Sequence, residues 1–235
     1  AITRPSRGLI SGKSALLILD GWTWEEMTIK APVSLIVNWP VMRTRQSAEM
    51  TQSEEDQKKQ IRENIENLYE FVEDSKSYMK AKTAPKSRQK FDARFEAMIP
   101  VLTNKLPVWV QANSLLQIES AIAWADKHQL DIVIVGGTDA PLAAHLLRPR
   151  KIPVIAVPIH TMPKYRDSDF DEPFTLPLKL FEAGIDFCIA SGSSSNARNL
   201  PYHAAKAAAY GLPGDEALKA ITLYPAQLAG VANTT

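Results

Sequence analysis

The stretch that decides the fold reads Asp186-Phe187-Cys188-Ile189-Ala190-Ser191-Gly192-Ser193, and it continues through an Ala-rich segment at 202–210. The apolar run from Phe187 to Ala190 ends in small and polar residues that are typical of turns. Two helical patterns follow. This order predicts a buried strand whose carboxyl end opens into a loop, which is where α/β folds place their sites.

Working outward from this strand, short apolar runs alternate with helical patterns from residue 107 onward. The alternation predicts a parallel sheet with right-handed crossovers, and strands without polar alternation predict burial on both faces. The predicted strands are 107–111, 131–135, 153–158 and 185–190. The predicted helices are 115–125, 140–147, 174–183, 202–210 and 215–223, with a last short one from Pro225.

The first 40 residues contain two further apolar runs, 14–19 and 32–38, which predict two more strands. Between them, Trp22 to Lys30 is a short amphipathic segment in which Thr23 is a candidate helix cap. About six strands are therefore expected, whereas a closed (β/α) barrel has eight.

Residues 43–98 are dense in charges of both signs. Apolar residues at helical spacing predict a long amphipathic helix over Glu54 to Lys80, broken by Thr83-Ala84-Pro85. Phe91, Phe95 and Met98 predict one face of a second helix. We interpret the charges as a solvated helical face, with a binding surface as the minority alternative. The segment is predicted to be a charged helical insertion in a single domain over 1–235.

Composition sets the broad class. The chain has 235 residues, 45% of them hydrophobic and 23% charged, with a formal net charge of +1. This is typical of a soluble globular protein, without the clustered basic face that nucleic-acid binding needs. No apolar run reaches the ~20 residues that a membrane helix requires. A single cysteine, Cys188, excludes an internal disulfide and leaves the compartment open between cytoplasm and periplasm.

Several motifs occur together: Gly211-Leu212-Pro213 followed by Glu216-Ala217-Leu218, and an Ala-Ile-Thr-x-x-Pro-Ala-x-x-x-Gly-Val ending at 220–231. Near the start, 8–12, 20–25 and 38–40 add Gly-Leu-Ile-Ser-Gly, Asp-Gly-Trp-Thr-Trp-Glu and Asn-Trp-Pro. Together they resemble the imidazolonepropionase-like members of the amidohydrolase superfamily. The resemblance implies hydrolysis of C–N bonds in linear or cyclic amides on a TIM-like (β/α) barrel.

The resemblance also places these strands within that barrel. The four later strands correspond to its last four, and the two early ones to its third and fourth. We therefore predict an α/β fold, a partial or truncated TIM-like barrel with parallel strands and a long helical insertion. The first two strand–helix units would lie upstream of Ala1. A homo-oligomer or an N-terminal segment would then cover the exposed sheet edges.

In the family, zinc or iron is held by a His-x-His pair, by histidines at later strand ends and by an aspartate at the last strand. Here Gln111 stands at one of these ligand positions and Gly192 at the place of the aspartate. The turn at 136–140 carries no histidine, and the chain contains no His-x-His. A neutral amide is a poor zinc ligand. The sequence thus predicts no metal and no cofactor held by this chain.

The remaining polar residues at the strand ends predict a pocket for a small-molecule amide ligand. It comprises Gln111, Asn113, Asp139, His160, Ser191, Ser193, Arg198 and Asn199. His160 is a substrate contact or acid–base group, or else a polar loop residue. Asp139 contacts a ligand or caps the helix from Ala140. The serine-rich loop offers N–H groups to an anion or carbonyl, and Arg198 contacts substrate or holds the loop.

The positions of the other histidines follow from the predicted helices that contain them. His128 and His145 are expected on helix surfaces or ends, and His203 near the start of an Ala-rich helix. Three functions stay open: an amidohydrolase-like protein that is catalytically degenerate for lack of metal ligands, which we favour; a hydrolase with a non-standard site; and a non-catalytic interaction or assembly subunit whose barrel another chain completes.

Overall fold

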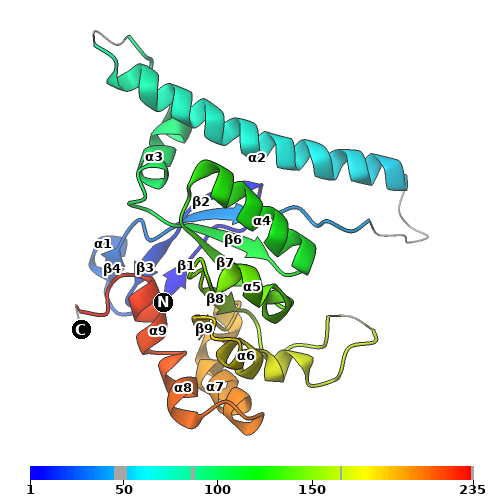
Figure 1. The fold of residues 1–235 in the computed structure, drawn as a ribbon. Coiled ribbons are helices and arrows are strands. Elements are labelled where there is room, and N and C mark those ends of the chain that lie inside the picture. The colour runs from blue at the N-terminus through cyan, green and yellow to red at the C-terminus, as the bar shows by residue number, and fades with distance from the viewer. Residues whose placement is uncertain (45–51, 86–87, 165, 234–235) are drawn as a thin grey trace. The chain divides into compact units, whose positions relative to one another are not determined.

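The computed structural model describes residues 1–44, 52–85, 88–164 and 166–233. The chain divides into two compact units. The first comprises Ala1–Val110 and Ser120–Ile132, and the second comprises Gln111–Glu119 and Val133–Thr235. Figure 1 shows the order of the elements along the chain.

The strands form two sheets. A three-stranded sheet has the order β1-β3-β4, and a six-stranded sheet has the order β2-β5-β6-β7-β8-β9. The strand bounds are β1 Ile2–Thr3, β2 Ile10–Lys13, β3 Ala15–Leu17, β4 Thr28–Lys30, β5 Leu35–Asn38, β6 Val108–Ala112, β7 Ile132–Gly136, β8 Val154–Ala156 and β9 Phe187–Ile189.

The three-stranded sheet corrects the prediction for residues 14–19. These residues do form a strand, β3, but it pairs antiparallel with β1 and β4 instead of joining the parallel strands. The neighbouring β2, which was not predicted, pairs antiparallel with β5. The predicted helix from Trp22 shortens to α1 (Trp24–Met27), because Thr28 onward pairs with β3 as β4. Its predicted cap is confirmed: the Thr23 side chain accepts a hydrogen bond from the Glu26 N–H.

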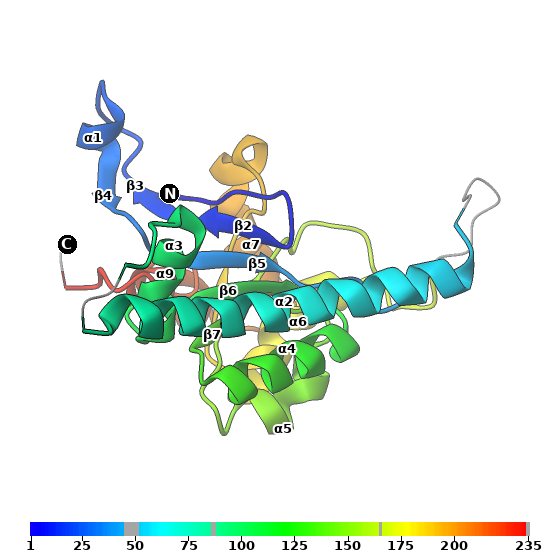
Figure 2. The same ribbon diagram turned by 90° about the horizontal axis from the view of Figure 1, so that it is seen from above.

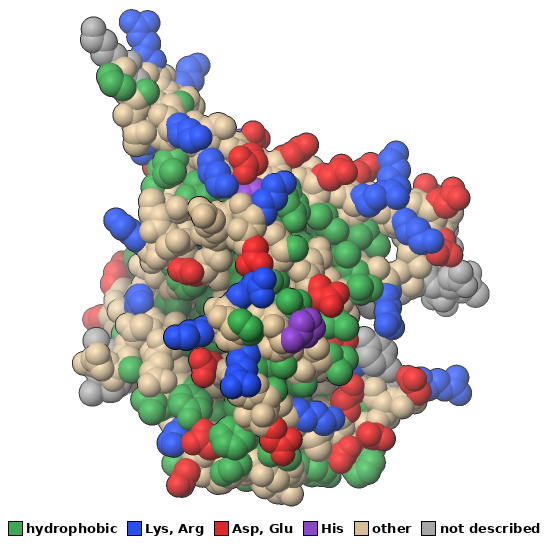
Figure 3. Space-filling model, viewed as in Figure 1, with side chains coloured by type: hydrophobic (Ala, Val, Ile, Leu, Met, Phe, Trp, Pro, Cys, Tyr) green, Lys and Arg blue, Asp and Glu red, His purple; other side chains and the backbone are tan. Residues whose placement is uncertain are grey.

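The charged segment forms α2 (Glu54–Thr83) and α3 (Ala93–Leu102), which lie side by side in Figures 1 and 2. The predicted long helix and its end before Pro85 are confirmed. Leu68 and Val72 bury the predicted apolar face of α2. Figure 3 shows lysine, arginine and acidic side chains mixed over α2. Phe91 corrects the prediction for the second helix, because it precedes α3 and is 76% exposed.

The later strands follow the predicted order. β7, β8 and β9 pair in parallel, and each is buried along its whole length. The bonds from Val108 N to Asp131 O and from Gly137 N to Ala112 O advance in the same direction, so β6 and β7 are parallel as well. The helices between and after these strands are α4 Leu115–His128, the 3₁₀ helix η1 Ala140–Ala143, α5 Ala144–Leu147, α6 Glu172–Glu182, the 3₁₀ helix η2 Ser194–Asn199, α7 Leu200–Ala209, α8 Gly214–Lys219 and α9 Leu223–Leu228.

The α/β class is thereby confirmed, with helices between parallel strands. The strand order of the larger sheet begins at β2 and ends at β9, and no closure into a barrel is found in the described ranges. The barrel stays a prediction. Among the residues that the structure places, no helix is both long and apolar enough to cross a membrane.

Candidate functional site

The carboxyl ends of β6 and β7 bring together three predicted site residues, Gln111, Asn113 and Asp139. Backbone bonds from Gly137 N to Ala112 O and from Asp139 N to Asn113 O, both 2.9 Å, align the two strand ends. Gln111 Nε2 donates to the Val135 carbonyl at 3.1 Å. These bonds order the polar side chains on neighbouring parallel strands, as expected for the site edge of an α/β sheet.

Asp139 is held between two elements. Its Oδ2 atom accepts a hydrogen bond from the Leu115 N–H at 3.0 Å, at the first residue of α4. The Lys164 ammonium lies 3.5 Å from the same oxygen. The carboxylate thus satisfies an amide at the positive end of the α4 dipole. It makes no side-chain cap to the helix from Ala140, so the sequence-based capping interpretation was wrong about which helix it serves.

Asn113 has a local network. Its side-chain oxygen Oδ1 lies 3.4 Å from the Thr138 hydroxyl, which donates to it. The backbone N–H groups of Asn113 and Ser114 both donate to Oε1 of Gln117, at 3.2 and 3.1 Å. Gln117 was not predicted as part of this site. Its position three residues after a serine, at the start of an apolar helix, resembles a capping box and could have indicated it.

Glycines occupy the strand ends at positions where a side chain does not fit. Gly136 has φ +99°, and a Cβ atom there would lie 2.2 Å from Asn113 Oδ1. Gly137 has φ +64°, and its Cβ would lie 2.7 Å from Val154 Cγ1. Gly192 has φ +79°, and its Cβ would lie 2.9 Å from Val157 Cγ1. L-residues rarely adopt such φ values.

His160 belongs to a second cluster, after β8. Its ring stacks on that of His203, with centroids 4.4 Å apart and planes 16° apart, and Phe174 meets it edge-on at 6.4 Å. His160 is exposed, whereas His203 in α7 is only 2% exposed, and its Nδ1 has no hydrogen-bond partner in the described structure. Burial, and next the charge of His160, lower the pKa of His203. A neutral imidazole is therefore favoured there.

The loop after β9 holds the remaining predicted residues. The Ser191 hydroxyl donates to the Ser193 carbonyl at 3.2 Å, which closes a small turn. Arg198 and Asn199 lie in η2, where Arg198 is exposed and Asn199 half-buried. Contacts join Gln111, Asn113 and Asp139 around their shared strand ends. His160 instead contacts α6 and α7, and the serine turn is closed by its own hydrogen bond.

Two further histidine placements follow from the structure. His145 is exposed on α5, as predicted. His128 is the last residue of α4, which confirms the predicted helix-end position, but it is buried at 3% exposure and does not lie on the helix surface. Its ring contacts Tyr69 and Trp124, and Nδ1 lies 3.0 Å from Glu73 Oε1. Burial is the main cause that lowers its pKa.

The metal that the family resemblance implies does not fit the residues found here. Gln111 is an amide bonded to the backbone, and the glycines at 136, 137 and 192 carry no ligand atoms. Among the residues that the structure describes, no three His, Cys, Asp or Glu side chains gather as a metal site. The stacked imidazoles of His160 and His203 have nearly parallel planes, so their in-plane lone pairs do not converge on one ion.

The fold is similar to that of a crystal structure of an amidohydrolase from Thermotoga maritima, with a TM-score of 0.78 and 21% sequence identity. The match covers 96% of this chain and 59% of the Thermotoga chain, so this chain spans less than two thirds of that protein. No protein-family model matches the chain, and no curated protein matches it significantly. The chain thus has an amidohydrolase-like fold.

Proposed function

We propose that the chain belongs to an imidazolonepropionase-like branch of the amidohydrolases and binds a small amide at the carboxyl ends of its strands. The residues that the structure describes do not build the metal centre by which the family hydrolyses C–N bonds. In this proposal the chain forms one amidohydrolase-like domain, with 43–98 as a charged helical insertion.

The observation that carries this proposal is the backbone conformation and close packing of the glycines at the strand ends. The resemblance places the family's aspartate at Gly192, where φ is +79° and a Cβ would meet Val157 at 2.9 Å. An aspartate there would need both a strained backbone and a displaced valine. Gly136 presents the same obstacle to a ligating side chain at the end of β7. The missing ligands therefore reflect backbone geometry as well as residue type.

The ligand class follows from the groups that remain. The described contact of the Asn113 side chain uses Oδ1, so its NH₂ group is suited to donate to a ligand carbonyl. The Ser191–Ser193 turn adds hydroxyl and backbone groups, and exposed His160 adds an imidazole that can donate or accept a hydrogen bond. Neutral donors and acceptors match an uncharged amide better than a strongly ionic ligand.

The test combines metal analysis with binding. We expect the purified chain to contain zinc and iron far below one equivalent and not to hydrolyse glutarimide or hydantoin. We expect ligand-observed NMR to detect binding of these cyclic amides, weakened about tenfold by Asn113→Ala, which removes one good hydrogen bond. His145→Ala, on the exposed face of α5, is the control. Stoichiometric zinc with chelator-sensitive amide hydrolysis would overturn the proposal.

A second candidate, an assembly subunit, is favoured by the hairpin of residues 18–30, which comprises α1, β4 and the turn before them. Five of its large apolar side chains are exposed, and Trp22 and Trp24 reach 96% and 72% exposure. The five are Ile18, Leu19, Trp22, Trp24 and Ile29. Thr23 caps α1, and the Ile18 N–H bonds to Met27 O at 2.8 Å, so the hairpin presents these side chains from ordered backbone. Clustered exposed apolar side chains typically mark an interaction surface.

The charges of the hairpin indicate the partner. It carries three acidic residues and one lysine: Asp20, Glu25, Glu26 and Lys30. A partner surface that is apolar and rimmed by Lys or Arg would complement it, whereas a symmetric contact with the same hairpin would oppose like charges.

A basic amphipathic helical peptide should therefore shift tryptophan emission to the blue, and its Glu-substituted analogue should not. Trp22→Phe/Trp24→Phe should lose the shift. Equal response to both peptides would exclude this candidate.

A further inference from the structure

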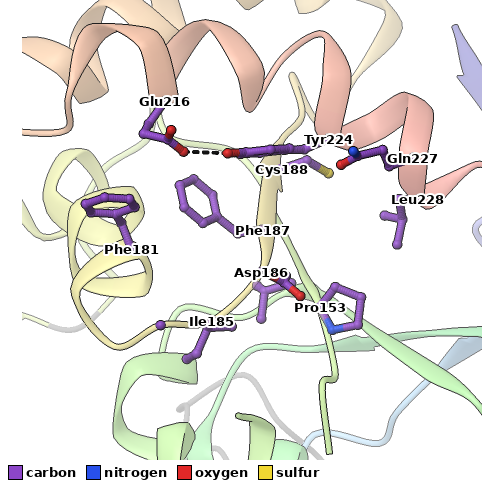
Figure 4. A pocket seen from close by; sticks show the side chains of 12 residues that line it. Pro153, Phe181, Ile185, Asp186, Phe187, Cys188, Glu216, Tyr224, Gln227 and Leu228 are labelled. Atoms are coloured by element: carbon purple, nitrogen blue, oxygen red, sulfur yellow. Dashed lines mark hydrogen bonds between the residues drawn. The ribbon is translucent and has the colours of Figure 1, made fainter. Parts of the chain in front are cut away.

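A cavity of about 470 Å³ lies near the amino ends of β8 and β9, away from the strand ends where the proposed amide site is located. Figure 4 shows its walls: α6 on one side, β9 in the middle, and α8 and α9 across the cavity. Its volume is in the range of small-molecule sites. It is lined by Pro153, Val154, Phe181, Gly184, Ile185, Asp186, Phe187, Cys188, Glu216, Tyr224, Gln227 and Leu228.

The apolar part of this cavity is aromatic. Phe187 is 5% exposed in β9, Phe181 is 42% exposed at the end of α6, and Tyr224 comes from α9. In Figure 4 the Phe181 and Phe187 rings lie near one another on the same side of the cavity. Aromatic faces bind both apolar rings and cations, because their quadrupole is negative over the ring.

The charged groups of the lining are both acidic. Glu216 Oε2 accepts a hydrogen bond from the Tyr224 hydroxyl at 2.5 Å, and its Oε1 lies 2.8 Å from the Lys219 ammonium. These two bonds lower the pKa of Glu216, so it stays ionised at neutral pH. Asp186 lies on the other side of the cavity in Figure 4, and no hydrogen bond or ion pair of its carboxylate is found among the described residues. Among the described residues, no lysine or arginine lines the cavity.

Both carboxylates lie close enough to Tyr224 to act on its hydroxyl. The hydrogen bond to Glu216 is the main cause that raises the pKa of Tyr224, and the charge of Asp186 adds to it. Glu216 is already paired with Lys219, so Asp186 is the carboxylate of the lining that is left to bind an ammonium group. Asp186 is exposed at the mouth, so it can exchange water for a ligand without an internal bond being broken.

We propose that this cavity binds an organic ammonium with an aromatic or branched apolar body, its charge toward Asp186 and its body between Phe181 and Phe187. The site is separate from the proposed amide site and does not depend on it. Its recognition combines a carboxylate at the mouth with an aromatic wall, a combination typical of amine recognition.

The test uses two matched probes, 3-phenylpropylamine and 3-phenyl-1-propanol, titrated into the full chain and followed by NMR. We expect the amine to bind at least tenfold more tightly than the alcohol. Asp186→Asn should reduce amine affinity about tenfold and leave the alcohol unchanged. Asp215→Asn, an exposed acid on α8 outside the lining, is the charge-matched control and should have no such effect.

A second variant tests the location. Gln227→Trp, at an exposed position of α9 in the lining, should fill the cavity and abolish binding of both probes while the chain remains folded by circular dichroism. Equal affinity for the two probes, an amine affinity unchanged in Asp186→Asn, or binding that persists in Gln227→Trp would each overturn the proposal.

Discussion

Replacing Gly136 by alanine tests the geometry of the strand ends most directly. The residue has φ +99°, and the new Cβ would lie 2.2 Å from Asn113 Oδ1 and 3.0 Å from Gln111 Nε2. Holding an L-residue at this φ costs about 1–3 kcal/mol, and relieving the overlap costs a similar amount. Alanine also restricts the unfolded chain, which offsets about 0.4–1 kcal/mol. We therefore expect a net loss of roughly 1–5 kcal/mol in the free energy of unfolding.

The assay is urea unfolding followed by far-UV circular dichroism, with the midpoint and the slope compared between variants. Gly214→Ala is the control, because in the described structure a Cβ atom at this position would have no neighbour within 4 Å, and the φ of Gly214 is ordinary. At the first residue of α8 it should stabilise by about 0.5–1 kcal/mol. Comparing the two variants separates the cost that is specific to position 136 from the general effect of replacing a glycine by alanine.

A double mutant makes the prediction refutable. Asn113→Ala removes the nearest clashing atoms, so Gly136→Ala should be less costly in its presence, with a coupling energy of about 1–3 kcal/mol. A loss below about 1 kcal/mol for Gly136→Ala, or strict additivity of the two changes, would show that the strand ends accept a side chain. Backbone geometry would then not be what excludes a metal ligand there.

Three further outcomes follow from single side chains. Asp139→Ala should cost about 0.5–2 kcal/mol in urea unfolding, because the Leu115 N–H at the start of α4 loses its acceptor; an unchanged midpoint would contradict this. Burial raises the pKa of Cys188 to about 12, so its reaction with a disulfide reagent at pH 8 should be on the order of a thousandfold slower in the native chain than in guanidinium. Fast native labelling would exclude a buried thiol. The lowered pKa of His128 means that its neutral form is stabilising above about pH 6.5 and that this contribution is lost as pH falls through the lower folded value; His128→Phe should make stability less dependent on pH between 7 and 5, and an unchanged dependence would refute this.

The sequence by itself determined the local elements. The spacing of Leu68 and Val72 and the Thr83-Ala84-Pro85 break predicted α2 almost to the residue, because apolar periodicity and helix ends depend on neighbours in the chain. The apolar runs from 107 onward likewise predicted β6 to β9 and their order. The residue types at the strand ends, an amide and several glycines, were visible without any coordinates.

Only the tertiary structure decided which of these residues meet. Asp139 bonds to α4 and not to the helix that follows it, and His203 is buried beneath His160; both depend on contacts between residues far apart in sequence. The apolar run at 14–19 predicted a further strand beside the parallel ones. The strand that forms there, β3, instead pairs antiparallel with β1 and β4 in a separate sheet. A short apolar run predicts a strand but does not predict which strand it pairs with, because strand pairing depends on packing and hydrogen bonding between residues far apart in the sequence.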